Sequence, residues 1–142
     1  MGAPQARLSE LGECLVDRGW GVEVLTALPN YPTGRVFPGY AARSPVVEQI
    51  GRLRTVRVPL YTAKTGFAKR LASYLSFAAS ATRYGATMCR RPDLLFVESP
   101  PLFIGYAARA LSLLWRCPFV FNVSDLWPES AIRMGILDEG VA

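Results

Sequence analysis

Histidine is absent from the 142-residue sequence. Catalytic triads built on histidine, zinc–histidine sites and imidazole acid–base chemistry are therefore excluded for these residues. Cysteine is scarce as well, because only Cys14, Cys89 and Cys117 occur and no two of them have CxxC spacing. An odd, widely spaced set predicts neither a disulfide framework nor a zinc site, and it favours a reducing, cytoplasmic location.

The sequence also lacks long apolar runs. No run reaches the roughly 18 residues of a membrane-spanning helix, and the N-terminus shows no basic–apolar–small signal pattern. Acidic residues are few, with eleven against sixteen basic ones and a net charge of +5. That excess favours anionic partners such as phosphates or a lipid surface. The basic residues are dispersed, which fits an ordinary solvated surface and does not predict nucleic-acid binding.

Apolar residues make up 51% of the chain and charged residues 19%, which is the composition of one folded domain. Their spacing predicts alternating helices and short strands. Helices are expected over residues 4–18, 67–88, 102–115 and from Pro128, and strands over 22–27, 46–50, 53–61, 94–98 and 118–123. A turn at Gly51 joins the second and third strands, with Arg54 and Arg57 expected on one face. This order is typical of an α/β fold with a doubly wound, Rossmann-like parallel sheet.

The chain opens on a helix at Pro4, with no strand before it. In a doubly wound sheet the first strand is central, and its turn into the first helix carries ligand-facing groups. We therefore expect that the first strand of the fold is missing from these residues. Gly2 would lie where the free N–H groups of the first helix meet a phosphate or a sugar.

Polar residues follow the strand predicted at 118–123, on the side where ligands bind in α/β sheets. Asp125 can hold a sugar hydroxyl or act as a base, while an Asx-type turn before the next helix explains it equally well. Trp127 offers a flat face to a sugar or a lipid, although packing is the commoner role of tryptophan. Glu129 falls in the first helical turn, where the helix dipole favours an acid in any case.

A second strand exit carries Glu98 and Ser99, which are candidates for ligand contact or for capping a turn before two prolines. A long loop rich in proline and glycine follows the strand at 22–27, and loops of that length in compact domains are often functional. Its amide, phenol and guanidinium groups suit recognition of polyols and phosphates, although a connecting loop has a similar composition. These groups belong to Asn30, Tyr31 and Arg35.

The helix predicted at 67–88 has basic ends and an apolar face that bears aromatic residues. Lysines and arginines flank that face between positions 64 and 91. Such a helix can lie in a bilayer interface, and packing of the same face on the sheet is the more common arrangement.

Six blocks of the sequence occur in an order that resembles a known family. They are APQARLSEL, RGWGVEVLTALPNYPTG, VFPGY, KRLASYLSF, RPDLLFVESPPLF and PFVFNVSDLWPES. Together they cover nearly the whole chain and resemble the N-terminal domain of retaining, GT-B-fold glycosyltransferases of family 4. The resemblance is to the branch that builds bacterial surface polysaccharides of the colanic-acid and O-antigen kind.

The resemblance implies a partial, acceptor-side N-terminal domain over residues 1–142, with the C-terminal donor-binding domain absent. The complete enzyme would move a sugar from a nucleotide-sugar donor to a lipid-linked glycan acceptor. It would retain the anomeric configuration and need neither a metal nor another cofactor. The 142-residue chain alone is not expected to catalyse transfer. The implied location is the cytoplasm, with peripheral association at the inner face of the cell membrane through the basic helix around 67–91.

Site residues follow from the same resemblance. Asp125 matches the acid of the family motif and is the predicted catalytic residue. Gly2 matches the glycine-rich turn after the first strand, and Ser124 stands where many relatives carry histidine. The predicted substrate-binding residues are Gly2, Asn30, Tyr31, Arg35, Glu98, Ser99, Ser124, Trp127 and Glu129.

Two other interpretations of the sequence remain open. The chain can be a non-catalytic module that binds a glycan or a phospholipid, or an inactive gene remnant. Salt-sensitive binding to anionic liposomes would favour the binding module. A dinucleotide-dependent oxidoreductase is disfavoured, because the GxGxxG strand–turn–helix signature is missing.

Overall fold

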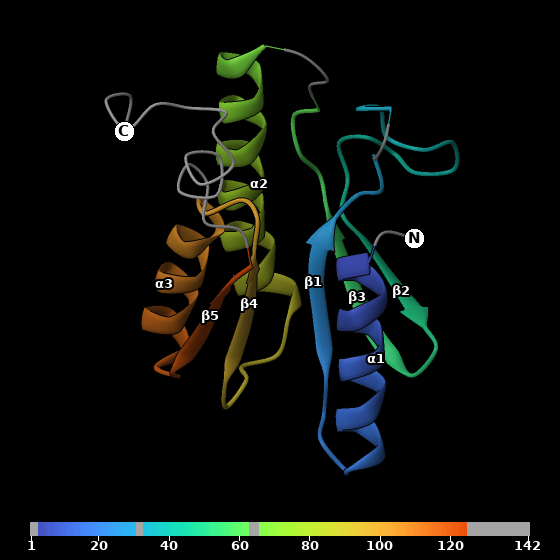
Figure 1. The fold of residues 1–142 in the computed structure, drawn as a ribbon, viewed down its shortest axis with the longest axis vertical. Helices are drawn as coiled ribbons and strands as arrows, with labels where there is room; N and C mark the ends of the chain where they lie inside the picture. Colours follow the sequence, from blue (N-terminus) through green and yellow to red (C-terminus); the bar gives the residue numbers. More distant parts are fainter. Residues whose placement is uncertain (1–2, 31–32, 63–65, 125–142) are drawn as a thin grey trace, which may run out of the picture. The chain divides into compact units, whose positions relative to one another are not determined.

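The computed structural model describes residues 3–30, 33–62 and 66–124. The chain divides into two compact units, Met1–Arg91 and Pro92–Ala142. Figure 1 shows the order of the elements, which are α1 (Ala3–Asp17), β1 (Glu23–Ala27), β2 (Val46–Ile50), β3 (Leu53–Val58), α2 (Phe67–Met88), β4 (Leu95–Ser99), α3 (Ile104–Trp115) and β5 (Phe119–Val123). The first unit holds α1 through α2, and the second holds β4, α3 and β5.

The first unit is built on a three-stranded sheet with the order β1-β3-β2. Strands β1 and β3 are parallel, with Leu25 opposite Val56, and β2 pairs with β3 in the antiparallel sense. Gly51 joins β2 to β3 with a φ of 57°, a conformation that glycine adopts without steric cost. The predicted turn at Gly51 and the strand on either side of it are thus confirmed.

Helix α1 lies against the face of β3 that carries Leu53. A Cβ on Gly12 would come within 2.9 Å of Leu53 Cδ1, so the absence of a side chain at Gly12 permits this close approach. Arg52, next to the Gly51 turn, places its Nε 2.9 Å from Glu13 Oε2, and its backbone N–H donates to Glu13 Oε1 at 3.0 Å. These two hydrogen bonds, the backbone one first, lower the pKa of Glu13.

Helix α2 contacts β1 and β3, and its C-terminal end is fastened to them by Arg54. Arg54 Nη1 lies 2.8 Å from Glu23 Oε1, and its Nη2 donates to the Met88 carbonyl at 3.0 Å. The backbone N–H of Arg90 donates to the other Glu23 oxygen at 3.0 Å. Because Leu53 and Arg54 are neighbours on a strand, they point to opposite faces, so α1 and α2 cover opposite faces of the sheet.

The expectation that Arg54 and Arg57 share a face is wrong. Side chains alternate along a strand with a period of two, so residues three apart point in opposite directions. Arg54 reaches Glu23 and α2, whereas Arg57 reaches Glu48 on β2. The offset between the two arginines is three residues, an odd number, which places them on opposite faces.

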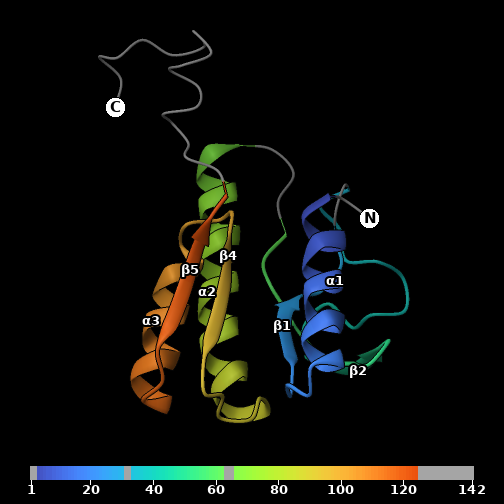
Figure 2. The ribbon, with the colours of Figure 1, turned by 60° about the horizontal axis from the view of Figure 1, so that its bottom comes forward.

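The described residues of the second unit form two parallel strands and one helix. Strands β4 and β5 pair with Leu95 opposite Phe119, and α3 lies against both of them, as Figure 2 shows. The side of α3 toward the strands is apolar, with Leu111 and Trp115 buried. Gly105 at its start allows close contact, because an added Cβ would lie 3.2 Å from a ring carbon of Phe121.

The predicted α/β class is confirmed, and each predicted helix and strand that falls on described residues is present with ends shifted by at most three residues. The sheet itself differs from the prediction in one respect. The described residues form two small sheets. One is mixed, because β2 runs antiparallel to β3, and the other is parallel. A single doubly wound sheet that joins them stays a prediction. The predicted helix at Pro128 lies outside the described residues.

We expect the core of the first unit to depend on Val56, which is fully buried, more than on Val47, which is 45% exposed and directly opposite it in the sheet. Val56→Ala should lower the free energy of unfolding by about 2 kcal/mol, from lost burial and the cavity left behind. Val47→Ala is the matched control and should cost only about 0.5 kcal/mol. Urea unfolding of both variants measures the difference, and equal losses would contradict this assignment of the core.

Candidate functional site

The carboxyl ends of β1 and β3 meet at one edge of the first sheet, because the two strands are parallel. The N-terminal end of α1 lies at the same edge (Figure 1). The loop between β1 and β2 leaves from this edge, and so does the segment that leads from β3 to α2. This edge is where the topology of an α/β sheet places ligands.

A network centred on Arg57 ties that loop to the sheet. Arg57 Nε donates to Glu48 Oε1, and the other Glu48 oxygen accepts a hydrogen bond from the Tyr40 hydroxyl at 3.1 Å. Arg57 Nη1 also donates to the carbonyl of Ala27, the last residue of β1, at 3.4 Å. The guanidinium carbon lies 6.0 Å from the centre of the Tyr40 ring. Loop, β1, β2 and β3 therefore meet at one arginine.

The Glu48 carboxyl stays ionised near neutral pH. The hydrogen bond from Arg57 is the main cause that lowers its pKa; the Tyr40 hydroxyl lowers it further, and partial burial opposes both. A carboxylate held in this way is a structural acceptor and not a proton-transfer group.

The loop residues predicted as ligands have local roles in this structure. Asn30 Nδ2 donates to the Leu28 carbonyl at 2.8 Å, and the Asn30 carbonyl accepts from the backbone N–H of Gly34 at 2.8 Å. The backbone N–H of Arg35 donates to the Thr33 hydroxyl at 3.3 Å, and its side chain is exposed. The Asn30 amide thus shapes the loop, while the Arg35 guanidinium faces solvent.

In the second unit, polar groups gather where β4 and β5 end. Asn122 Nδ2 donates to Glu98 Oε2 at 2.7 Å and lies 3.1 Å from the Ser124 hydroxyl oxygen. The Ser124 hydroxyl in turn donates to Glu98 Oε1. The structure therefore brings the predicted residues Glu98 and Ser124 together. Asn122 was missed, and its signal in the sequence is a lone polar side chain inside the apolar run FVFNV.

Ser99 does not join this cluster. It follows Glu98 on β4 and points to the opposite face, where it is fully buried. Its hydroxyl has no hydrogen-bond partner within the described part of the chain. A ligand that approaches Glu98 therefore does not meet the Ser99 side chain from the same side.

Five predicted site residues lie outside the described residues. They are Gly2, Tyr31, Asp125, Trp127 and Glu129. Their roles stay predictions. Within residues 3–30, 33–62 and 66–124, no group of three or more cysteine, aspartate and glutamate side chains is arranged to hold a metal ion. Burial raises the pKa of the Cys89 thiol to about 11, which disfavours its reactive thiolate form.

Comparison with known proteins identifies the family. A sequence profile of the glycosyl transferase 4-like domain matches residues 2–139. The chain belongs to the glycosyl transferase 4-like family. This membership confirms the resemblance drawn from the six sequence blocks.

One curated relative of this family member is the putative colanic acid biosynthesis glycosyl transferase WcaI of Escherichia coli K12. The two sequences are 31% identical over 135 residues, which cover 92% of this chain. The chain spans 32% of the length of that relative. No solved structure matches the chain.

The ion pair between Glu48 and Arg57 should make stability depend on pH. Because the pKa of Glu48 is lowered on folding, its contribution is complete above the ordinary value of 4.5 and is lost as the pH falls through the lower folded value. Glu48→Gln should therefore be less stable than the native chain at about pH 7, with the difference shrinking at about pH 3.

Urea unfolding at the two pH values measures this difference. Glu10→Gln removes an exposed carboxylate from α1 and serves as the matched control. A Glu48→Gln deficit that is the same at both pH values would rule out the charge of Glu48 as its source.

Proposed function

We propose that this chain is the acceptor-side part of a retaining glycosyltransferase of bacterial surface polysaccharide biosynthesis. The match of residues 2–139 to the glycosyl transferase 4-like domain carries the proposal. In it, a sugar moves from a nucleotide-sugar donor to a lipid-linked glycan acceptor. The relative from Escherichia coli, named for colanic acid biosynthesis, supports this class of product.

The polar cluster at the ends of β4 and β5 supports a role in holding the acceptor. Glu98 is fixed between Asn122 and Ser124, so its carboxylate has a defined position at the strand ends. Carboxylate and hydroxyl oxygens at such a place can accept hydrogen bonds from sugar hydroxyls. Asp125 comes next in the chain, and we assign it the catalytic role of binding the reacting hydroxyl and accepting its proton.

Most of the remaining catalysis is assigned to the part of the enzyme that holds the donor. Transfer with retention passes through a state with positive charge at the anomeric carbon and a leaving diphosphate. Stabilising both charges requires groups placed around the donor. Because the chain spans 32% of its relative, we propose that those groups come from the other two thirds of such an enzyme.

A chimaeric enzyme tests the transferase proposal. Residues 2–139 would replace the matching segment of the Escherichia coli relative, and sugar transfer from a panel of nucleotide sugars to lipid-linked acceptors would be measured. Asp125→Asn should lower turnover at least about 100-fold, the usual effect of losing a general base. Asp93→Asn, at an exposed position before β4, is the matched control and should leave turnover unchanged.

Full activity of the Asp125→Asn chimaera would remove Asp125 from the chemistry. An inactive chimaera that still folds and binds acceptor would favour the alternative of a glycan-binding module without transfer. Activity of the chimaera without the Asp125 substitution would exclude the interpretation of the chain as an inactive gene remnant.

Membrane association is a second proposal, favoured by the length of α2. The 22 residues of α2 span about 33 Å, whereas the six residues of β3 span about 20 Å. The N-terminal part of α2 therefore extends past the ends of β1 and β3, as Figure 1 shows. Tyr74 and Leu75 in this part are 39% and 47% exposed.

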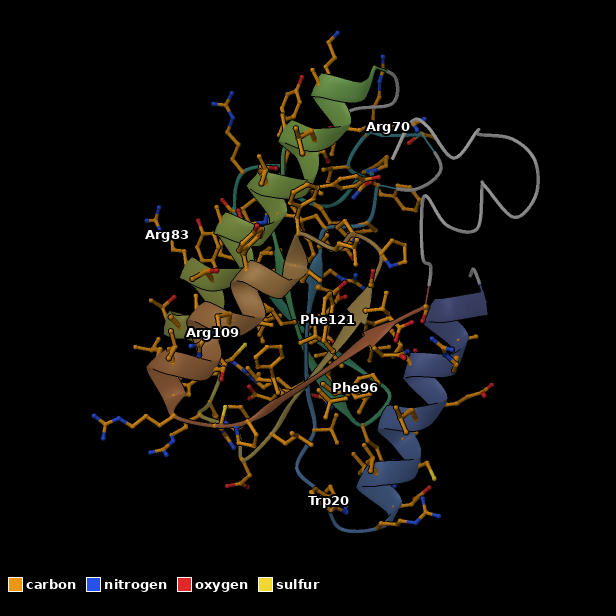
Figure 3. The ribbon with its side chains drawn as sticks, turned by 60° about the vertical axis from the view of Figure 1, so that its left-hand side comes forward. Trp20, Arg70, Arg83, Phe96, Arg109 and Phe121 are labelled. Atoms are coloured by element: carbon orange, nitrogen blue, oxygen red, sulfur yellow. The ribbon has the colours of Figure 1, made fainter. Side chains whose placement is uncertain are left out.

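Basic side chains accompany this apolar surface. Lys69 and Arg70 are exposed in the first turns of α2, and Arg83 extends outward further along the helix (Figure 3). Exposed aromatic and aliphatic side chains beside basic ones suit the interface of an anionic membrane. No helix in the described part of the chain is long and apolar enough to cross a bilayer. We therefore propose peripheral binding at the cytoplasmic face of the cell membrane, through α2.

Vesicle cosedimentation tests this surface. Tyr74→Ser combined with Leu75→Ser should weaken binding to vesicles that contain phosphatidylglycerol by about tenfold, because the apolar contact is lost. Leu113→Ser combined with Leu114→Ser, which changes exposed leucines of α3, is the matched control. Equal weakening by both pairs would mean that α2 has no special role in vesicle binding. Added salt should weaken binding of the native chain, because it screens the attraction between basic side chains and anionic lipids.

A further inference from the structure

The first unit contains a groove that none of the roles assigned so far uses. It has a volume of about 270 Å³ and lies beyond the carboxyl end of β3. The loop after β1 contributes Arg43, the segment after β3 contributes residues 59–61, and α2 contributes Ser76 and Ser80. Three separate segments of one compact unit thus form its walls.

Hydrogen bonds hold these walls in place. The backbone N–H of Tyr61 donates to the Ser76 hydroxyl oxygen at 2.8 Å, and that hydroxyl donates to the Ser73 carbonyl at 2.8 Å. On the other side, the backbone N–H of Ser44 donates to the Ala41 carbonyl at 3.1 Å and closes a turn around Arg43. The Tyr40–Glu48–Arg57 network anchors the same loop to the sheet. The groove is therefore a built feature of the fold.

Three polar side chains of the groove have no partners in the described part of the chain. Arg43 makes no ion pair there, in contrast to Arg52, Arg54 and Arg57, each of which is paired with a carboxylate. The hydroxyls of Tyr61 and Ser80 likewise make no hydrogen bond with described residues, whereas Ser76 is engaged. None of the described residues that line the groove is acidic. A guanidinium and two hydroxyls are left to bind something else.

We propose that this groove binds the phosphate ester of a phosphorylated saccharide. Arginine binds phosphate with two parallel charge-assisted hydrogen bonds, which fits Arg43. The hydroxyls of Tyr61 and Ser80 can donate to phosphate or sugar oxygens, and Pro59 with Leu60 offers an apolar wall to the C–H face of a sugar ring.

The groove is shallow and wide open to solvent, and its volume of about 270 Å³ is below the roughly 300–1,000 Å³ of pockets for drug-sized ligands. One phosphorylated monosaccharide unit suits it. The site rests on the proposed function in one respect, because a lipid-linked acceptor carries such a phosphate next to its first sugar. The source of the ligand is then a free sugar phosphate or the headgroup of a lipid-linked saccharide.

Binding of glucose 1-phosphate to the full chain tests the groove. Chemical-shift titration should show the largest changes at residues 42–43, 59–61 and 76–80, and glucose alone should not bind. Arg43→Gln should weaken binding by about tenfold, and Arg43→Lys, which keeps the charge without the two-pronged geometry, by less. Arg109→Gln removes the same charge from an exposed position of α3, to which no binding role is assigned, and should leave affinity unchanged.

Two results would overturn the proposal. One is equal weakening by Arg43→Gln and Arg109→Gln, which would indicate attraction to net charge only. The other is a set of shift changes that avoids the groove. Because Arg43 is exposed, its variants should melt at the same temperature as the native chain, and this separates binding from folding.

A second arm separates the two sources of the ligand. The same titration with glucosyl phosphoryl polyprenol in detergent micelles should show the same dependence on Arg43. Tighter binding there than for glucose 1-phosphate would assign the groove to the lipid-linked form, and the reverse would assign it to the free sugar phosphate. Neither arm needs a donor or turnover. An inactive chimaera with intact binding would count against the transferase proposal alone, and an active one without binding would count against the groove alone.

Discussion

The first unit is organised by arginines on and beside its central strand. Strand alternation sends Arg54 toward α2 and Arg57 toward the loop and β2, while Arg52 at the preceding turn reaches α1. These three pairs differ in strength, because water and salt screen exposed charges. The Arg57 side chain is 18% exposed and that of Arg52 is 52% exposed. The pair that orders the loop after β1 therefore has the least exposed arginine of the three.

Two arginines at this edge of the sheet differ in what they can do, because one is paired within the fold and the other is not. Arg57 and Glu48 satisfy one another and Tyr40, so they fix positions and have little left to offer a ligand. Arg43, in the same loop and on the groove, keeps its charge without a partner among the described residues. An arginine without a carboxylate partner in the fold is a candidate for binding an anionic ligand. Arg43 meets this condition among the described residues, whereas Arg57 does not.

Local patterns in the sequence predicted the helices, the strands and the Gly51 turn, because these depend on near neighbours in the chain. They did not predict which residues meet across strands. Asn122 lies opposite Glu98 only because of the register of β4 and β5, and that register depends on packing between segments 24 residues apart. The prediction that Arg54 and Arg57 share a face was wrong, although the alternation of side chains along a strand places residues three apart on opposite faces. Its position after a predicted strand made Asp125 a candidate, which no local pattern distinguishes from an Asx-type turn, and the family resemblance gave it the predicted catalytic role.

The bonds at the ends of β4 and β5 have a consequence for selectivity. Glu98 already accepts hydrogen bonds from Asn122 and from Ser124, one on each oxygen. An incoming hydroxyl competes with these internal donors, so it gains only the difference between the new bond and the old one. A group that donates to Glu98 and also accepts from the displaced Ser124 restores both bonds, whereas a group that can only donate, such as an ammonium, leaves one unmade. Under the proposed acceptor-binding role, the cluster would therefore favour hydroxyl groups over groups that only donate.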